Sequence, residues 1–290
     1  MAAMDSSAQD AVYVFTFSCE DRIGIVASVT TELAAIGANI AESQQFWDRG
    51  TGQFFMRIAF SVPAGTTRET IESALRSPVA RFNLKTTLSG ERRAKLIIMV
   101  SRFDHAALHL LYQIRVGWLK ADAVAIVSNH PDTDGVYAHE GVPFHHWPVT
   151  KETKAEQEDR LIDLVVKTGA DVVVLARYMQ VLSDRMSTRL FGKIINIHHS
   201  FLPSFKGAKP YHQAHERGVK LIGATAHYVT PDLDEGPIIE QETERVTHAM
   251  SADDFVAAGR DIESRVLARA VRLHVESRVM LNGHKTVVFG

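Results

Sequence analysis

The chain of 290 residues is longer than one ordinary compact domain, so two domains of unequal size are expected. Its 32 basic and 34 acidic residues leave a net charge of −2, which gives no electrostatic footprint for nucleic acid or an anionic membrane and favours a small-molecule partner. The single cysteine, Cys19, excludes an intramolecular disulfide and a multi-cysteine metal site and is typical of a reducing cytoplasm.

The start of the chain carries no pattern of export. Residues Met1–Val12 lack the basic start and the apolar run of a signal peptide, and no later stretch is apolar over the length of a bilayer. We therefore expect a cytoplasmic protein without a membrane partner.

The first elements in chain order alternate between strands and helices. Apolar Ile25, Val29 and Leu33 recur at helical spacing, and Gly37 then supplies a stop. The expected strands are Val12–Ser18, Asn39–Trp47, Gln53–Val62 and Phe82–Leu88, and the expected helices are Ile23–Ile36 and one that Thr66 caps and that ends near Ala80. This β-α-β-β-α-β order within about 80 residues predicts a ferredoxin-like α+β domain over residues 8–90.

A polar segment, Ser89–Arg93, separates this region from one with a different pattern. The following strands are short and almost continuously apolar: Lys95–Val100, Ala123–Val127, Val172–Ala176 and Ile194–Ile197, with helical patterns at His105–Val116 and Lys154–Thr168 between them. Strands of this kind are buried on both faces. They predict a mainly parallel, Rossmann-like α/β domain over residues 94–290, with its reactive groups at the carboxyl ends of the strands.

The densest group of polar side chains follows the strand that ends near Ile197. Side chains alternate along a strand, so Asn196 and His198 point to one face and His199 to the other. An amide donor beside an imidazole suits a reaction that polarises a carbonyl group and moves a proton. We therefore expect Asn196 and His198 to act as a pair, while His199 is interpreted as a packed or supporting residue.

A second strand-like segment, Gly223–Val229, runs into an acidic loop. Three carboxylates, Asp232, Asp234 and Glu235, lie there between Pro231 and Pro237. Any of the three could activate water or orient His198, and the pattern of the residues leaves that choice open.

These segments resemble the folate-dependent formyltransferase superfamily, in which Asn-x-His at a strand end is joined by an Asp from a Leu-Asp-x-Gly-Pro loop. The resemblance runs from Lys95 to about Val246 and includes the stretch Ser200–Gly207 and the pattern from His212 to Gly218. It implies that Asn196 donates a hydrogen bond to the formyl oxygen and that His198 stabilises the tetrahedral intermediate. It also implies that Asp234 is the orienting carboxylate and proton acceptor.

The same resemblance implies where folate binds. The segment after the third strand is similar to the family's pterin-binding segment, and the acidic loop is implied to help it. The implied folate-binding residues are Tyr178, Gln180, Val181, Leu182, Thr230 and Asp232.

The loop after the first strand of this region bears on the acceptor of the formyl group. Ribonucleotide transformylases have a glycine-rich loop there that wraps a phosphate in backbone N–H groups, whereas this chain has Ser101–His105, without glycine. The loop and the stretch Ser128–Asp132 resemble the formyltetrahydrofolate deformylases. Water is then the implied nucleophile, and the reaction releases formate and tetrahydrofolate from 10-formyltetrahydrofolate.

The N-terminal region resembles ACT domains through Asp21–Val26 and Gly37–Ile40. ACT domains pair side by side and bind small amino acids between subunits, so the resemblance implies a homo-oligomer with an amino-acid effector near Gly24 and Asn39. A purely oligomer-building role for this domain is the alternative.

The expectation is thus a hydrolase of one-carbon metabolism that supplies formate for purine synthesis, balances folate pools and uses folate as substrate rather than a cofactor. The 14 histidines form no recognisable metal-ligand spacing. The main alternative is a formyl transfer to an amine acceptor at the same folate site. A third possibility is an amino-acid sensor whose second domain only binds folate.

Overall fold

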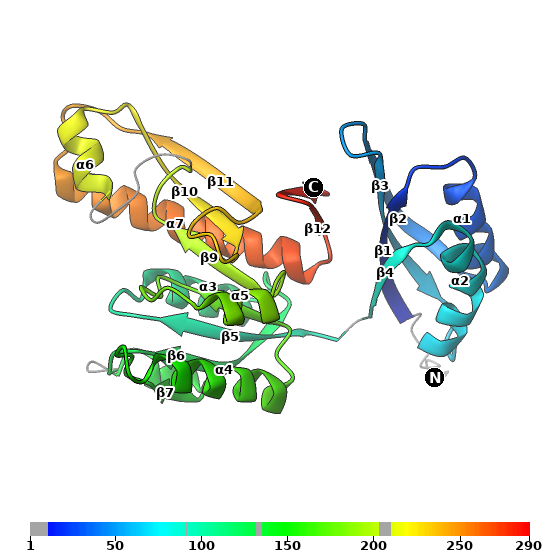
Figure 1. The fold of residues 1–290 in the computed structure, drawn as a ribbon, viewed down its shortest axis with the longest axis horizontal. Coiled ribbons are helices and arrows are strands. Elements are labelled where there is room, and N and C mark those ends of the chain that lie inside the picture. Colours follow the sequence, from blue (N-terminus) through cyan, green and yellow to red (C-terminus); the bar gives the residue numbers. More distant parts are fainter. Residues whose placement is uncertain (1–10, 91, 132–134, 203–209) are drawn as a thin grey trace, which may run out of the picture. The chain divides into compact units, whose positions relative to one another are not determined.

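The computed structural model describes residues 11–90, 92–131, 135–202 and 210–290. The chain forms two compact units, one made of the residues up to Arg92 together with Val287–Gly290, the other made of Arg93–Thr286 (Figure 1). The end of the chain therefore differs from the predicted range 94–290, because its last four residues group with the first unit. Among the described residues, no helix has both the length and the apolar character needed to cross a membrane.

The first unit is a four-stranded antiparallel sheet with two helices. Its elements are β1 (Ala11–Glu20), α1 (Ile25–Ala35), β2 (Asn39–Asp48), β3 (Gln53–Val62), α2 (Arg68–Phe82) and β4 (Lys85–Ser89). The strands lie in the order β2-β3-β1-β4. Phe17, Met56 and Phe60 of the sheet pack with Val29 and Leu33 of α1 in one apolar core. The predicted β-α-β-β-α-β order is present.

Helix α2 begins and ends later than its pattern predicted. The cap is Thr67 and not Thr66, since its hydroxyl oxygen accepts a hydrogen bond from the Thr70 amide at 3.2 Å. The helix continues through Pro78 to Phe82 because Ile71, Leu75, Pro78 and Phe82 form one buried stripe along it. The following strand consequently starts at Lys85 rather than at Phe82.

The second unit contains a seven-stranded sheet in the order β11-β10-β9-β8-β5-β6-β7. Its elements up to the middle are β5 (Ala94–Val100), α3 (His105–Arg115), β6 (Ala121–Ser128), η1 (Ala138–Glu140), β7 (Phe144–His146), α4 (Lys154–Thr168) and β8 (Val172–Leu175). They are followed by α5 (Asp184–Arg189), β9 (Ile194–His198), α6 (Pro210–Arg217), β10 (Leu221–Tyr228), β11 (Ile238–Arg245), α7 (Ala252–Val275), β12 (Val279–Asn282) and β13 (Lys285–Val288). The five strands from β7 to β9 are parallel, whereas β10 and β11 join antiparallel. The prediction of a mainly parallel α/β sheet is confirmed.

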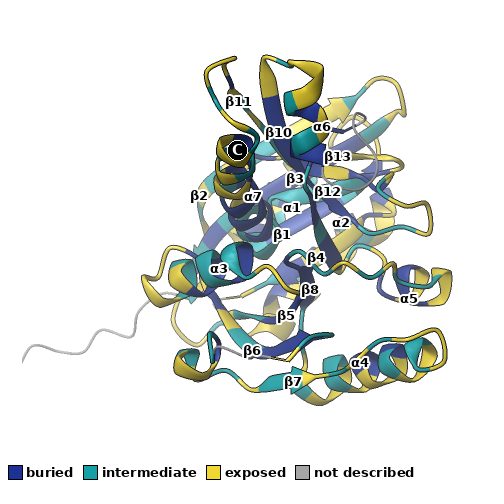
Figure 2. Ribbon diagram, turned by 90° about the vertical axis from the view of Figure 1, so that its left-hand side faces the viewer, coloured by how far each residue is buried: buried dark blue, intermediate teal, exposed yellow. Residues whose placement is uncertain are grey.

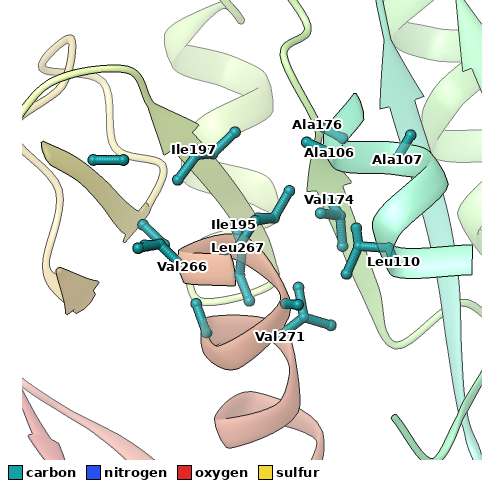
Figure 3. Close-up of a cluster of buried hydrophobic side chains, with 14 of the residues drawn as sticks. Ala106, Ala107, Leu110, Val174, Ala176, Ile195, Ile197, Val266, Leu267 and Val271 are labelled. Carbon is teal, nitrogen blue, oxygen red and sulfur yellow. The ribbon is translucent and has the colours of Figure 1, made fainter. Parts of the chain in front are cut away.

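Both faces of this sheet are covered, which explains its continuously apolar strands. On β5, Ile98 and Val100 belong to a core that includes α3 and α7, while Ile97 and Met99 belong to a second core that includes α4 and α5. Figure 3 shows part of the first core, where labelled side chains of α3 and α7 gather around Ile195 and Ile197 of β9. In Figure 2, β10 is largely dark blue, whereas α4 shows yellow, teal and dark blue in turn, because only one of its faces is buried.

Candidate active site

Three segments that carry polar side chains leave the sheet at one edge. Strands β5, β8 and β9 are parallel, with β8 between the other two, so their carboxyl ends lie side by side. The loop at Ser101 follows β5, the segment from Arg177 follows β8, and His198 ends β9. This is the edge at which ligands bind in open α/β sheets.

Asn196 and His198 lie on the same face of β9. Their neighbours Ile195 and Ile197 point into the core with α3 and α7, so the two polar side chains face the opposite way, as the alternation predicted. His198 is buried, and its Nδ1 lies 3.3 Å from Oδ2 of Asp234. The structure thus brings Asp234, which is distant in the sequence, into contact with His198 of the predicted pair.

The loop between β10 and β11 sets the position of Asp234. Gly236 packs so closely on the preceding strand end that a Cβ atom there would lie 1.7 Å from the Tyr228 carbonyl oxygen. Asp234 itself has a positive φ of 59°, an uncommon conformation for a residue other than glycine. Asp232 and Glu235 are exposed, so of the three loop carboxylates only Asp234 turns towards β9.

Asp234 is held as a carboxylate. Its partial burial by itself would raise its pKa, but the hydrogen bond from His198, together with the charges that the rings of His198 and His227 can carry, holds the pKa of Asp234 well below its usual range. A carboxylate of this kind is a weak base. It is better suited to orienting an imidazole than to taking a proton from water.

Asp234 also fixes which nitrogen of His198 carries a proton. A carboxylate oxygen can only accept, so Nδ1 of His198 donates to Asp234 and Nε2 keeps its lone pair in the neutral ring. That Nε2 atom is buried and has no hydrogen-bond partner among the described residues. A buried imidazole nitrogen with a free lone pair can take a proton from a water molecule.

His227 completes the group and was not predicted from the sequence. It is directly opposite Asn196 in the pairing of β10 with β9 and is almost fully buried. Its Nδ1 lies 2.9 Å from the Tyr228 carbonyl oxygen, and its Nε2 lies 3.2 Å from Nδ2 of Asn196 and 3.7 Å from Oδ1 of Asp234. In the neutral ring, Nδ1 donates to the carbonyl and Nε2 accepts from the Asn196 amide, which fixes the orientation of that amide.

The predicted folate segment lies directly after β8. Tyr178, Gln180, Val181 and Leu182 line a cavity together with residues of α4, whereas Thr230 and Asp232 do not line it and lie in the loop that carries Asp234. Glu158 of α4 fixes the end of the segment, because its carboxylate accepts hydrogen bonds from both the backbone and the hydroxyl of Ser183. Burial, with a contribution from Glu158, raises the pKa of Tyr178 to about 12, so this phenol stays neutral.

Side chains after β5 and β6 tie this segment to the sheet edge. The Ser101 hydroxyl donates to Oδ1 of Asn129 at 2.6 Å and accepts from the Met179 amide at 3.0 Å. Asp132, the end of the stretch Ser128–Asp132, lies outside the described residues, as do residues 203–207 of the stretch Ser200–Gly207.

The predicted effector residues belong to the first unit. Gly24 precedes α1 with φ of 94°, and Asn39 is the exposed first residue of β2. Cys19 is buried in the core of that unit. Within the described residues, no group of three or more His, Cys, Asp or Glu side chains is arranged to hold a metal ion.

Comparisons with known proteins identify relatives of the chain. The sequence family described as formyl transferase matches residues 94–271. A formyltetrahydrofolate deformylase of Corynebacterium sp. (strain P-1) is 48% identical over 95% of this chain and 97% of its own length.

Solved structures show the same relationship. The crystal structure of a formyltetrahydrofolate deformylase from Burkholderia mallei matches with a TM-score of 0.92 at 48% identity, over 97% of this chain and all 100% of that one. A glycinamide ribonucleotide transformylase from Symbiobacterium toebii matches with a TM-score of 0.63 at 28% identity, over 70% of this chain and 97% of that one.

Proposed function

Because the chain belongs to the formyltetrahydrofolate deformylase family, we propose that it hydrolyses 10-formyltetrahydrofolate to formate and tetrahydrofolate at the site built by Asn196, His198 and Asp234. The observation that carries the proposal is the pairing of Nδ1 of His198 with the Asp234 carboxylate, which leaves the buried Nε2 free to act on water.

In the proposed reaction, His198 is the general base. Its Nε2 takes a proton from a water molecule as the water oxygen attacks the formyl carbon, and the Asp234 carboxylate stabilises the imidazolium that forms. The intermediate then collapses, the bond between the formyl carbon and N10 breaks, and His198 returns the proton to N10. Positioned proton transfer of this kind contributes about 10²- to 10⁴-fold to a rate. The family resemblance implied that Asp234 both orients His198 and accepts the proton; this proposal keeps the orienting role and assigns the proton to His198.

Asn196 provides the hydrogen bond to the formyl oxygen as negative charge develops there. One N–H of its amide points to Nε2 of His227, so the second N–H is left for the substrate. A single donor of this type is worth about 10²- to 10³-fold in kcat. His227 is a positioning residue in this scheme, since it holds the donor without touching the formyl group.

Folate binding is proposed for the segment after β8 and for the loop after β10. The largely apolar lining beside Gln180, Val181 and Leu182 supports a place for the pterin ring next to backbone amides and carbonyls, and the cavity of about 20 Å³ there must widen to admit it. Thr230 and Asp232 would contact the pterin through the loop backbone, which the hydrogen bond from the Thr230 hydroxyl to the Asp232 carbonyl oxygen stiffens at 3.0 Å.

The first unit is proposed to be a ferredoxin-like ACT domain with a regulatory role. Its connectivity and strand order support the proposal. The proposal includes a small amino-acid effector near Gly24 and Asn39, a homo-oligomer, a cytoplasmic location, formate supply to purine synthesis and no cofactor besides the folate substrate.

An incubation without an acceptor tests the reaction. Purified protein, 10-formyltetrahydrofolate and buffer that contains no amine should release formate and tetrahydrofolate in equal amounts. If formate appears only as a formylated amine after an amine is added, the chain is a transferase and the hydrolase proposal is wrong.

A further inference from the structure

A cluster of side chains beside the proposed active site takes no part in the hydrolysis. It consists of Phe103, His105, Arg177, Tyr211, Arg260 and Glu263, which come from the loop after β5, the start of α3, the segment after β8, and helices α6 and α7. We refer to it as the edge cluster. Its centre is Glu263, which is 1% exposed.

Glu263 binds three other members of the edge cluster. One of its oxygens accepts from the Tyr211 hydroxyl at 2.8 Å, and the other lies 2.8 Å from Nε2 of His105 and 3.3 Å from Nε of Arg177. Burial alone would raise the pKa of Glu263, but the hydrogen bond from His105 and the charge of Arg177 outweigh burial and lower it. Glu263 is therefore an ionised, buried anchor.

The aromatic ring of Phe103 closes the outer side of the cluster. The guanidinium carbons of Arg177 and Arg260 lie 5.4 Å and 5.2 Å from the centre of this ring, within the range of cation–π attraction. Gly259 allows Tyr211 to pack at the inner side, because a Cβ at Gly259 would lie 2.2 Å from the tyrosine ring. The space over the end of β5 is thus filled by side chains.

The edge cluster borders the catalytic group. Arg177 follows β8, the strand that lies between β5 and the strand of His198. The ring of His199 lies 5.1 Å from that of His198, and the charges of Arg177 and Glu263 both act on His199. A second substrate that reached the formyl carbon along the end of β5 would have to pass through this space.

The side chain of Arg177 occupies part of this space. Its guanidinium is largely buried, and Nε and Nη1 have no hydrogen-bond partner among the described residues. Its charge is paired with the Glu263 carboxylate at 3.3 Å, so Arg177 acts through the space that its side chain fills. The backbone of Arg177 has a positive φ of 65°, which a non-glycine residue keeps only where its surroundings impose it.

We infer that the edge cluster determines the choice of nucleophile: by filling the space over β5 with the packed side chains of Phe103 and Arg177, it excludes an amine acceptor and leaves water to attack the formyl group. This rests on the proposed function. The same fold serves a relative whose name states transfer to glycinamide ribonucleotide, so the fold by itself does not decide between the two reactions.

Opening the cluster should therefore admit an amine. In Phe103→Ala, the nitrogen of a small primary amine attacks the formyl carbon, the bond to N10 breaks, and the proton lost by the amine is returned to N10, which yields a formamide and tetrahydrofolate. Phe103 is 39% exposed, so its removal should not unfold the protein. Arg177→Gly is a second variant, because glycine accepts the positive φ freely.

The experiment measures the ratio of N-formylglycinamide to formate when 10-formyltetrahydrofolate is turned over with excess glycinamide. The wild-type protein should give formate almost alone, whereas both variants should raise the ratio roughly tenfold or more, which corresponds to about 1.4 kcal/mol between the two barriers. Tyr112→Ala is the matched control, since Arg115 stacks on that ring at 5.7 Å near the other end of α3, and its ratio should equal that of the wild type.

An unchanged ratio in both variants, with formate still released, would overturn the inference while leaving the hydrolase function intact. Absence of formate from the wild-type protein would instead contradict the proposed function. If one variant does not fold, the other decides.

Discussion

Asp234 is the residue on which the proposed chemistry depends most directly. Asp234→Asn keeps the size of the side chain but cannot stabilise the imidazolium of His198, so kcat should fall by about 10²- to 10⁴-fold. Folate affinity should change little, because the amide retains the shape of the loop. Asp232→Asn is the matched control, since Asp232 is exposed and its backbone carbonyl oxygen, not its carboxylate, accepts the Thr230 hydroxyl. Formate release and tetrahydrofolate binding should be measured for both. A larger defect in Asp232→Asn would show that the wrong carboxylate was assigned.

His227 should affect turnover rather than binding. In His227→Phe the ring shape is kept but the acceptor for the Asn196 amide is lost, so the amide can turn away from the formyl oxygen. Misplacement of such a group by about 1 Å can cost 10²-fold, and we expect kcat to fall by up to that factor while KM stays near its normal value. His215→Phe, at a histidine of α6 that hydrogen-bonds the Met250 carbonyl, is the control. A rise in KM alone would argue against the positioning role.

Two partly buried histidines should make the fold sensitive to acid. Burial, with the charge of Arg177, lowers the pKa of His199 to about 4, and burial lowers the pKa of His274 to about 4. An unfolded histidine titrates near 6.5. Between these values the unfolded chain binds more protons, so the stabilisation is complete above pH 6.5 and is lost as the pH falls towards 4.

We expect each of these histidines to lower the free energy of unfolding by up to about 1.4 kcal/mol per pH unit in that window. Urea unfolding at several pH values between 7.5 and 4.5 measures the slope. His274→Phe should make the slope shallower, although it loses the hydrogen bond with the Tyr228 hydroxyl. An equally steep slope in this variant would rule out His274 as a source.

The three residues proposed as catalytic could be chosen from the sequence, but their supporting residues could not. Asn196 and His198 share a strand face, which alternation predicts, and the motif singled out Asp234 among three acids. His227 faces Asn196 only through the register of β10 on β9, which no local pattern specifies. Glu263 and Arg177 meet across 86 residues of chain, so their contact is a property of the tertiary fold.

At the scale of elements, Gly236 is the point at which the loop after β10 is fixed. Gly236→Ala would place a Cβ 1.7 Å from the Tyr228 carbonyl oxygen, so the loop must move and take Asp234 away from His198. We expect a loss of kcat of about 10²-fold or more, with a smaller effect on the melting temperature, since the cores of the sheet are untouched. Leu233→Ala, at a side chain that is 60% exposed, should be close to normal in both. Normal turnover in Gly236→Ala would contradict this role of the loop.

The sequence predicted the existence and type of most early elements better than their ends. Periodicity located α1 and the strands of the parallel sheet, because burial dictates those patterns directly. It misplaced α2 at both ends, since the buried stripe from Ile71 to Phe82 outweighs the local cues of Thr66 and Pro78. The sequence analysis predicts no helix or strand beyond Val246. It therefore misses α7, which carries Glu263 and packs against β9 and β10.

For the whole molecule, the proposed regulation predicts that the response to the effector can be lost while formate release remains. Glycine, as a first trial effector, should change the rate of formate release by the wild-type protein, and Asn39→Ala should abolish that response while basal turnover stays normal. Asn39 is an exposed residue of the first unit, so its loss should not disturb the fold. An unchanged glycine response in Asn39→Ala would contradict the effector site proposed there.

The first unit cannot be removed by a deletion at its N-terminal boundary alone, because it also contains Val287–Gly290. Deletion of Met1–Gly90 alone would leave Val287 and Phe289, which are buried, without the unit to which they belong. The polar stretch Ser89–Arg93 indicates where the chain passes from the first unit to the second. No change in composition indicates where it returns to the first unit after Thr286. A return of four residues is too short to leave a pattern in the sequence.

The most direct test of the hydrolase assignment follows the oxygen of water. The protein should be given 10-formyltetrahydrofolate in ¹⁸O-labelled water without any amine, and the formate released in a single turnover should be analysed by mass spectrometry. We expect one labelled oxygen in each formate, since one oxygen comes from the attacking water and the other from the formyl group. Formate without the label, or no formate until an amine is supplied, would contradict attack by water at this site.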